Sequence, residues 1–162
     1  FHYFGAQGKQ WVQVSMTTPE GKSISGYMHV SRILPFEKMK RLQQGKEISI
    51  SYTTQPFDQT GHKITKIKTE VLGKSMATPF GELMVDSQDE ITAVNLTLNG
   101  KKISVAKELH AGLYEPGKEF TIYQHGGAHF IHQHCSDGAG GYIIVWVVLK
   151  DGTLSRALFS PY

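Results

Sequence analysis

Apolar and polar residues alternate along most of this chain, which is the pattern of half-buried β-strands. Residues 11–16, for example, place Val12, Val14 and Met16 on one face. Residues 142–149 are apolar on both faces, as expected of a central strand that is covered on both sides. Comparable strand patterns, bounded by turn residues, cover 24–30, 47–53, 63–71, 80–85, 91–98, 101–106, 120–125, 128–135 and 154–159. The chain is therefore predicted to be mainly β.

One segment departs from this alternation. Phe36, Met39 and Leu42 recur at helical spacing between Pro35 and Gly45. Because proline suits the first turn of a helix and glycine suits the residue beyond its end, we expect one short helix near residues 35–44.

The chain has 162 residues, enough for one domain or for two small ones. Residues 73–79, GKSMATP, are small and polar and include a proline, which is typical of a joint between units. We therefore expect residues 1–72 to form a small β-barrel-like unit that contains the helix. Residues 73–162 are then expected to form an antiparallel β-sandwich or barrel-like unit.

Two glycine-containing pairs predict tight hairpins in the second unit. Asn99-Gly100 and Gly126-Gly127 can both supply the positive φ angles of a two-residue turn. The second turn would fix the pairing of its strands, because the side chains alternate between faces. In that register His125 faces Ala128, Tyr123 faces Phe130, Thr121 faces His132 and Glu119 faces His134.

Residues 124–141 hold four of the eight histidines and the only cysteine. Alternation places Cys135 on the apolar side of the hairpin, together with Phe120, Ile122 and Ile131. A cysteine in such a position is a small hydrophobe and not a reactive nucleophile. His132, His134 and Glu119 are expected on the opposite side, with His125 nearer the turn.

The histidine side of the hairpin has two interpretations. In the first, Glu119, His132 and His134 present three ligands to zinc and leave one position open for a water that supports hydrolysis. In the second, which we favour, these side chains form a patch that faces solvent or a partner and holds no cofactor. The glycine-rich loop that follows is expected to contribute, because recognition residues concentrate on loops held by rigid scaffolds. The predicted partner-binding residues are Tyr123, His132, His134, Ser136, Asp137, Gly138 and Gly140.

The composition narrows the functional classes. Hydrophobic residues make up 40% and charged residues 19%, which is ordinary for a folded globular chain. The net charge is +3, but the lysines are scattered and form no stripe, so nucleic-acid binding is not expected. One cysteine excludes an internal disulfide. Since no Ser-His-Asp order with a nucleophile elbow, no HExxH and no GxGxxG occurs, we expect no catalytic residues.

The first residues, FHYFG, also have two interpretations. Aromatic residues gather at membrane interfaces, so these residues could end a membrane anchor that lies outside this chain. They could equally form a first strand. No run of about 18 apolar residues is present.

The second half resembles the β-rich periplasmic proteins of Gram-negative bacteria, a group that includes immunity proteins against secreted toxins. The resemblance covers residues 78–162 and depends on Thr78-Pro79-Phe80-Gly81, the hairpin at 98–101, a polar glycine-rich loop before an apolar strand, and the closing turn at 151–153. Related chains often carry cysteines around that loop, where this chain has only Cys135. The resemblance transfers no functional residue.

Together these features lead us to expect a periplasmic, non-catalytic binding protein. Its partner would be another protein, such as a toxin or a cell-wall enzyme that it blocks as an immunity protein or inhibitor. The alternative is a metal-binding protein or metal-dependent hydrolase that uses the His/Glu face.

Overall fold

A computed structural model describes residues 2–4, 10–17, 23–57, 89–135 and 141–159. These residues confirm the mainly β class, since they form antiparallel strands and only three short 3₁₀ helices. The strands are β1 (His2–Phe4), β2 (Trp11–Thr17), β3 (Ser23–His29), β4 (Lys40–Leu42), β5 (Ile48–Pro56), β6 (Asp89–Leu98), β7 (Lys101–Ile103), β8 (Thr121–His125), β9 (Ala128–Cys135), β10 (Tyr142–Val148) and β11 (Leu154–Phe159). The 3₁₀ helices are η1 (Val30–Arg32), η2 (Phe36–Lys38) and η4 (Lys107–Leu109).

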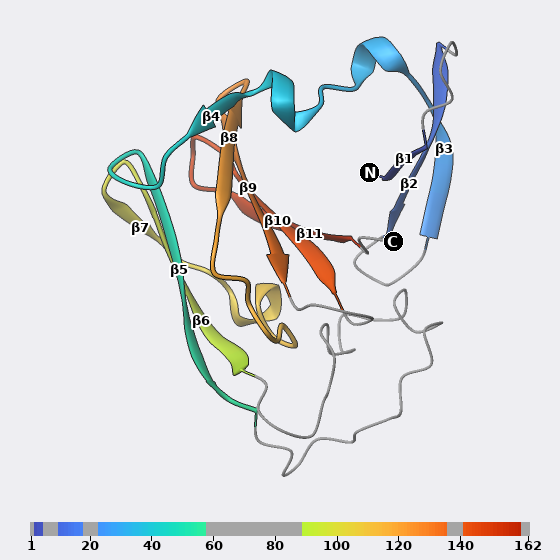
Figure 1. Cartoon of the computed structure of the whole chain (residues 1–162). Coiled ribbons are helices and arrows are strands. Elements are labelled where there is room, and N and C mark those ends of the chain that lie inside the picture. Colours follow the sequence, from blue (N-terminus) through green and yellow to red (C-terminus); the bar gives the residue numbers. More distant parts are fainter. Residues whose placement is uncertain (1, 5–9, 18–22, 58–88, 136–140, 160–162) are drawn as a thin grey trace.

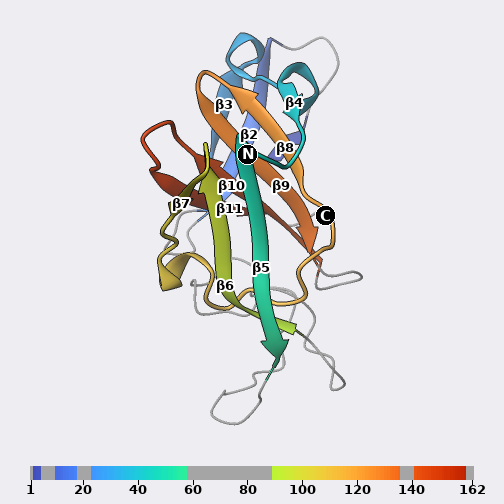
Figure 2. The same cartoon turned by 90° about the vertical axis from the view of Figure 1, so that its left-hand side faces the viewer.

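The strands form three open sheets, with the orders β1-β2-β3, β11-β10-β9-β8-β4 and β5-β6-β7. Figure 1 shows the five-stranded sheet in the middle, with β5-β6-β7 on one side and β1-β2-β3 on the other. The view from the side in Figure 2 agrees, with β5 and β6 in front of β9 and β10. None of these sheets closes into a barrel, so the barrel-like form predicted for residues 1–72 is not found among the described residues.

The sheets also cross the predicted boundary between the two units. β4 pairs with β8, and β5 pairs with β6, so strands from residues 1–72 share sheets with strands from residues 73–162. The hydrogen bonding therefore does not follow the predicted division. A small, polar segment indicates a surface connection, but its composition does not reveal whether the strands on either side pair with each other. The boundary itself and the predicted strands 63–71 and 80–85 lie outside the described residues.

The prediction of a helix near residues 35–44 is wrong. Only Phe36–Lys38 is helical, as the single 3₁₀ turn η2, and Lys40–Leu42 is the edge strand β4. Three apolar residues at intervals of three also suit this arrangement, because Phe36 packs on an aromatic ring of β8 while β4 hydrogen-bonds to the same strand. A segment this short gains more from tertiary contacts than from helix propensity.

The predicted hairpins are confirmed. Asn99 and Gly100 have φ of 51° and 74°, and Gly126 and Gly127 have φ of 58° and 82°, as a type I′ turn requires. β7 is shorter than the predicted strand 101–106. Residues His2–Phe4 form β1, in agreement with the first-strand interpretation of FHYFG.

The hydrophobic core lies between the five-stranded sheet and β5-β6-β7. β10 is an interior strand that pairs with β9 and β11. Its core side, which carries Trp146, is buried throughout, while on the other side Val145 is buried and Ile143 and Val147 are half-buried, so the predicted cover on both faces is only partial. The indole Nε1 of Trp146 donates to the Tyr52 hydroxyl oxygen at 2.9 Å, which joins β10 to β5 across the two layers. The buried cluster includes Ile48, Ile50, Ile91, Leu96, Ile122, Ile131, Ile144, Trp146 and Val148.

Candidate partner-binding face on the β8–β9 hairpin

The β8–β9 hairpin carries the predicted histidine patch on its non-core side. Its register matches the prediction from His125↔Ala128 to Thr121↔His132. Ile122, Ile131 and Cys135 are buried on the core side, while His132 is half-buried and His134 is exposed on the other. We call this other side the histidine face: Thr121, Tyr123, Phe130, His132 and His134. It is the side of the sheet that is turned toward the β1-β2-β3 layer (Figure 1).

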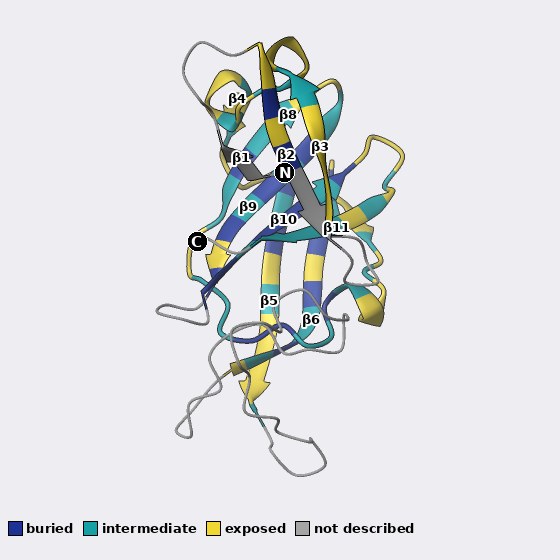
Figure 3. Ribbon diagram, turned by 90° about the vertical axis from the view of Figure 1, so that its right-hand side faces the viewer, coloured by how far each residue is buried: buried dark blue, intermediate teal, exposed yellow. Residues whose placement is uncertain are grey.

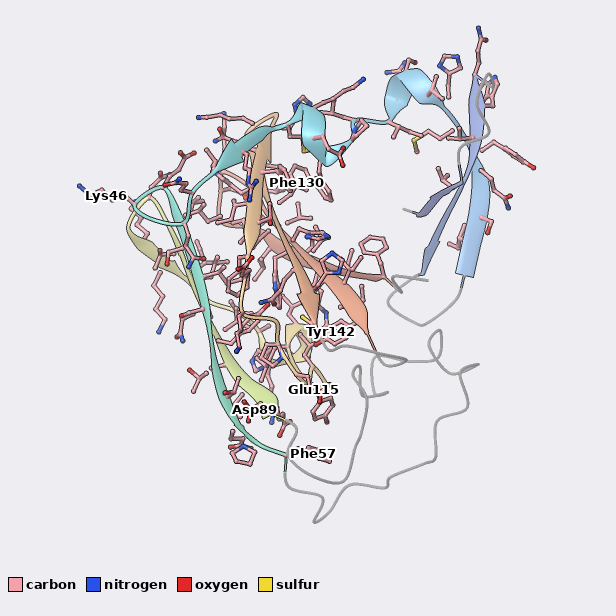
Figure 4. The ribbon with its side chains drawn as sticks, in the orientation of Figure 1. Lys46, Phe57, Asp89, Glu115, Phe130 and Tyr142 are labelled. Atoms are coloured by element: carbon pink, nitrogen blue, oxygen red, sulfur yellow. The ribbon has the colours of Figure 1, made fainter. Side chains whose placement is uncertain are left out.

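Aromatic rings join these residues into one surface. Phe36 stacks on Tyr123 with ring centroids 4.9 Å apart and an interplanar angle of 11°. The same ring lies 6.1 Å from Phe130 and 5.9 Å from His132. Sequence reasoning missed Phe36 because it was assigned to a helix. Figure 4 places Phe130 beside β8, toward the opposite end of the sheet from Tyr142.

An open depression lies at the end of the histidine face away from the hairpin turn. It is lined by Lys118, Glu119, Thr121, His132, Gln133 and His134. Two imidazoles, an ammonium and a carboxylate therefore border one small surface hollow. Such groups can donate hydrogen bonds to the polar atoms of a partner, or accept hydrogen bonds from them, at neutral pH.

The His132 ring is less easily protonated than an ordinary imidazole. Burial lowers its pKa from the usual 6.5, and the neighbouring imidazole of His134 lowers it further. The two rings meet edge to face, with centroids 4.9 Å apart. At neutral pH His132 is consequently a neutral hydrogen-bonding ring, suited to contact with polar groups.

The predicted pairing of Glu119 with His134 is wrong. The ladder between β8 and β9 stops at Thr121↔His132, and Glu119 precedes β8 in the exposed part of the connection from η4. Among the described residues, no group of three or more His, Cys, Asp or Glu side chains is placed to hold a metal ion. The register argument for this pair failed because it assumed that β8 continues beyond its real start. The zinc set itself stays a prediction, since Glu119, His132 and His134 all border the depression.

A buried polar contact positions the depression from behind. Gln133 is buried, and its Nε2 donates to the Gly117 carbonyl oxygen at 2.6 Å. Gly117 lies so close to the backbone of His134 that a Cβ atom at residue 117 would overlap the His134 carbonyl. Only glycine permits this approach, so the connection before β8 is held against the end of β9.

Cys135 is buried, as predicted. Its thiol donates to Gln133 Oε1 at 3.4 Å, and burial raises its pKa. A protonated thiol in the core is a poor nucleophile, so the residue contributes packing to the back of the histidine face.

His129 departs from the other three histidines of the segment because it points into the protein. It is 4% exposed, and its Nε2 lies 3.1 Å from Glu47 Oε1. Gln124 Nε2 donates to the same carboxylate oxygen at 2.7 Å. The bond with His129 is the main reason that the pKa of Glu47 falls below its usual value. The alternation that placed Ile131 in the core also places His129 there, and the sequence prediction overlooked it.

The structure thus brings together three of the predicted partner-binding residues, Tyr123, His132 and His134. The other four, Ser136, Asp137, Gly138 and Gly140, lie outside the described residues, directly after β9. Phe36 and Lys118 join the site as residues that the sequence prediction did not include.

Comparisons with protein-family models, with curated proteins and with solved structures each found no match. Among the described residues, no helix is long and apolar enough to cross a membrane.

Proposed function

We propose that this chain is a non-catalytic binding protein whose histidine face contacts another protein. The observation that supports this proposal is the continuous surface of half-buried and exposed rings formed by Phe36, Tyr123, His132 and His134. Rings with polar edges are enriched where proteins contact one another, because they supply area and hydrogen bonds at a low entropy cost. The depression beside His134 would receive a polar side chain of the partner.

The one thiol of the chain, Cys135, is buried, so this face does not present a thiol nucleophile. We further propose that the protein acts in the periplasm, where it blocks a toxin or a cell-wall enzyme in the manner of an immunity protein. The turn motifs of the second half, which resemble β-rich periplasmic proteins, are the basis for that part of the proposal.

Site-specific photo-crosslinking in the producing cells tests the interface. A photoreactive residue at position 134 should give a discrete heavier adduct with one protein. The same residue at Glu108, exposed in η4 on another part of the chain, should give none. If the residue at position 134 gives no adduct, or if the residues at 134 and 108 crosslink to the same proteins, the histidine face is not a specific interface.

Affinity for the captured partner then provides a matched comparison between two exposed histidines of one hairpin. His134→Ala should weaken binding by about tenfold or more, as expected for a residue near the centre of an interface. His125→Ala, at the hairpin tip, should leave the affinity within about twofold. Equal losses for the two variants would place the contact elsewhere.

The 4.9 Å separation of the His132 and His134 rings favours a second candidate, weak metal binding completed by a ligand from elsewhere. Metal analysis of the tag-free purified protein decides between the two. Stoichiometric zinc, nickel, copper or iron that is lost in His132→Ala would support the metal candidate, and protein without metal would refute it.

A further inference from the structure

The β1-β2-β3 sheet forms a surface separate from the histidine face. Its three strands contain no Asp, Glu, Lys or Arg, although such residues make up 19% of the chain. An uncharged sheet on the outside of a protein needs an explanation, because solvated strand faces are usually rich in charged residues.

The pairing of β2 with β3 separates their residues into two different faces. Trp11 lies opposite His29 and Gln13 lies opposite Tyr27, so these four residues share one face, together with Ser25. The other face carries Val12 and Val14, which are buried. Trp11 is 57% exposed and Tyr27 is 73% exposed. We call the first set the aromatic face: Trp11, Gln13, Ser25, Tyr27 and His29. Buried and exposed residues alternate along the described part of β2 (Figure 3).

The rings of this face are arranged for contact and not for burial. Trp11 meets His29 edge to face, with centroids 5.3 Å apart, although Trp11 remains 57% exposed. The Nδ1 atom of His29 accepts the backbone N–H of Ser31 at 3.3 Å. The other ring nitrogen, Nε2, joins the Gln13 amide and the Ser25 and Tyr27 hydroxyls as a hydrogen-bonding group.

We infer that the aromatic face binds an uncharged glycan. A sugar ring has faces of C–H groups that pack against the electron-rich faces of aromatic rings, and a rim of hydroxyls that bond to amides, hydroxyls and imidazoles. Trp11 and Tyr27 are diagonal neighbours across the strand pair, so their Cα atoms are about 7–8 Å apart. Two rings at this spacing can contact neighbouring sugar units of one linear glycan.

Other ligand classes fit this face less well. Single-stranded nucleic acid also stacks on aromatic rings, but it needs a positively charged groove, and these strands have no Lys or Arg. A membrane surface needs aliphatic side chains to insert and cations to meet the lipid headgroups. The described aliphatic residues of β2 and β3, namely Val12, Val14, Ile24 and Met28, all lie on the opposite face.

Titration with cellohexaose, chitohexaose and maltohexaose tests this inference, with tryptophan fluorescence and calorimetry as readouts. The chain has two tryptophans, and Trp146 is fully buried, so a fluorescence change on binding would report Trp11. At least one hexasaccharide should bind. Trp11→Ala and Tyr27→Ala should each weaken that binding by about tenfold or more. Both side chains are largely exposed, so the variants should keep the native fold, checked by circular dichroism.

His134→Ala, on the histidine face, should bind the hexasaccharide like the wild type, which separates this inference from the proposed protein interface. The inference is overturned if none of the three sugars binds at millimolar concentration, or if binding survives both aromatic substitutions. It is also overturned if Trp11 responds to phosphatidylglycerol or phosphatidylcholine vesicles and to no sugar. The inference is likewise rejected if no sugar binds to the wild type and Trp11→Ala instead abolishes the binding of a protein partner.

Discussion

Tyr52→Phe removes one oxygen atom and should cost the protein about 1–3 kcal/mol of stability. The Tyr52 hydroxyl accepts the indole N–H of Trp146, whose side chain is 0% exposed. Phenylalanine keeps the ring and its edge-to-face contact with Phe120 at 5.3 Å. The substitution therefore leaves the packing in place and deprives a buried donor of its acceptor. Because the Trp146 side chain is buried, most of the desolvation penalty of its N–H should be felt.

Urea unfolding, followed by circular dichroism, measures this cost. With an m value of about 2 kcal/mol/M, the midpoint should fall by about 0.5–1.5 M. Tyr27→Phe is the matched control, because it removes the same atom from a side chain that is 73% exposed. Its stability should stay within about 0.5 kcal/mol of the wild type. If the two variants have the same midpoint, the bond between Tyr52 and Trp146 does not join the layers.

Three further predictions concern titratable groups. The folded protein holds the pKa of Glu47 below its usual 4.5, so the carboxylate stabilises the fold above that pH. This contribution is lost as the pH falls below 4.5. Urea midpoints measured between about pH 6 and pH 3 should therefore fall more steeply for the wild type than for Glu47→Gln. His132 should titrate below 6.5 in NMR spectra, and His134→Gln should raise its midpoint without restoring 6.5, because burial remains; an unchanged midpoint would show that the two rings do not interact. Cys135 should react with a thiol reagent only at the rate of unfolding, and rapid labelling of the native protein would contradict its burial.

The sequence predicted the second half of the fold better than the first, for a physical reason. The hairpins at Asn99-Gly100 and Gly126-Gly127 are local, so a turn and two alternating strands fix their register without help from the rest of the chain. β4 has no such local partner. Its pairing with β8 depends on an edge supplied by residues far along the chain, and three apolar positions at helical spacing concealed it.

The candidate site, like the fold, was predictable only where local strand alternation decides the position of a residue. Alternation placed Tyr123, His132 and His134 on one side and Cys135 on the other, as the structure has them. Phe36 could not be anticipated, because it reaches Tyr123 from a segment whose path depends on tertiary contacts. Glu119 was misplaced because strand ends depend on the packing of the connection, here on the approach of Gly117 to His134.

The pairing of β5 with β6 and of β4 with β8 has a consequence for how the chain folds as it is made. Ile48 pairs with Leu98 and Leu42 pairs with Ile122, so the early strands find their hydrogen-bonding partners only after the ribosome has added most of the chain. Non-local pairings of this kind slow folding, because a long loop must close before any contact repays the lost entropy. Fragments that stop near residue 72 should therefore emerge with unpaired strand edges and depend on chaperones to avoid aggregation.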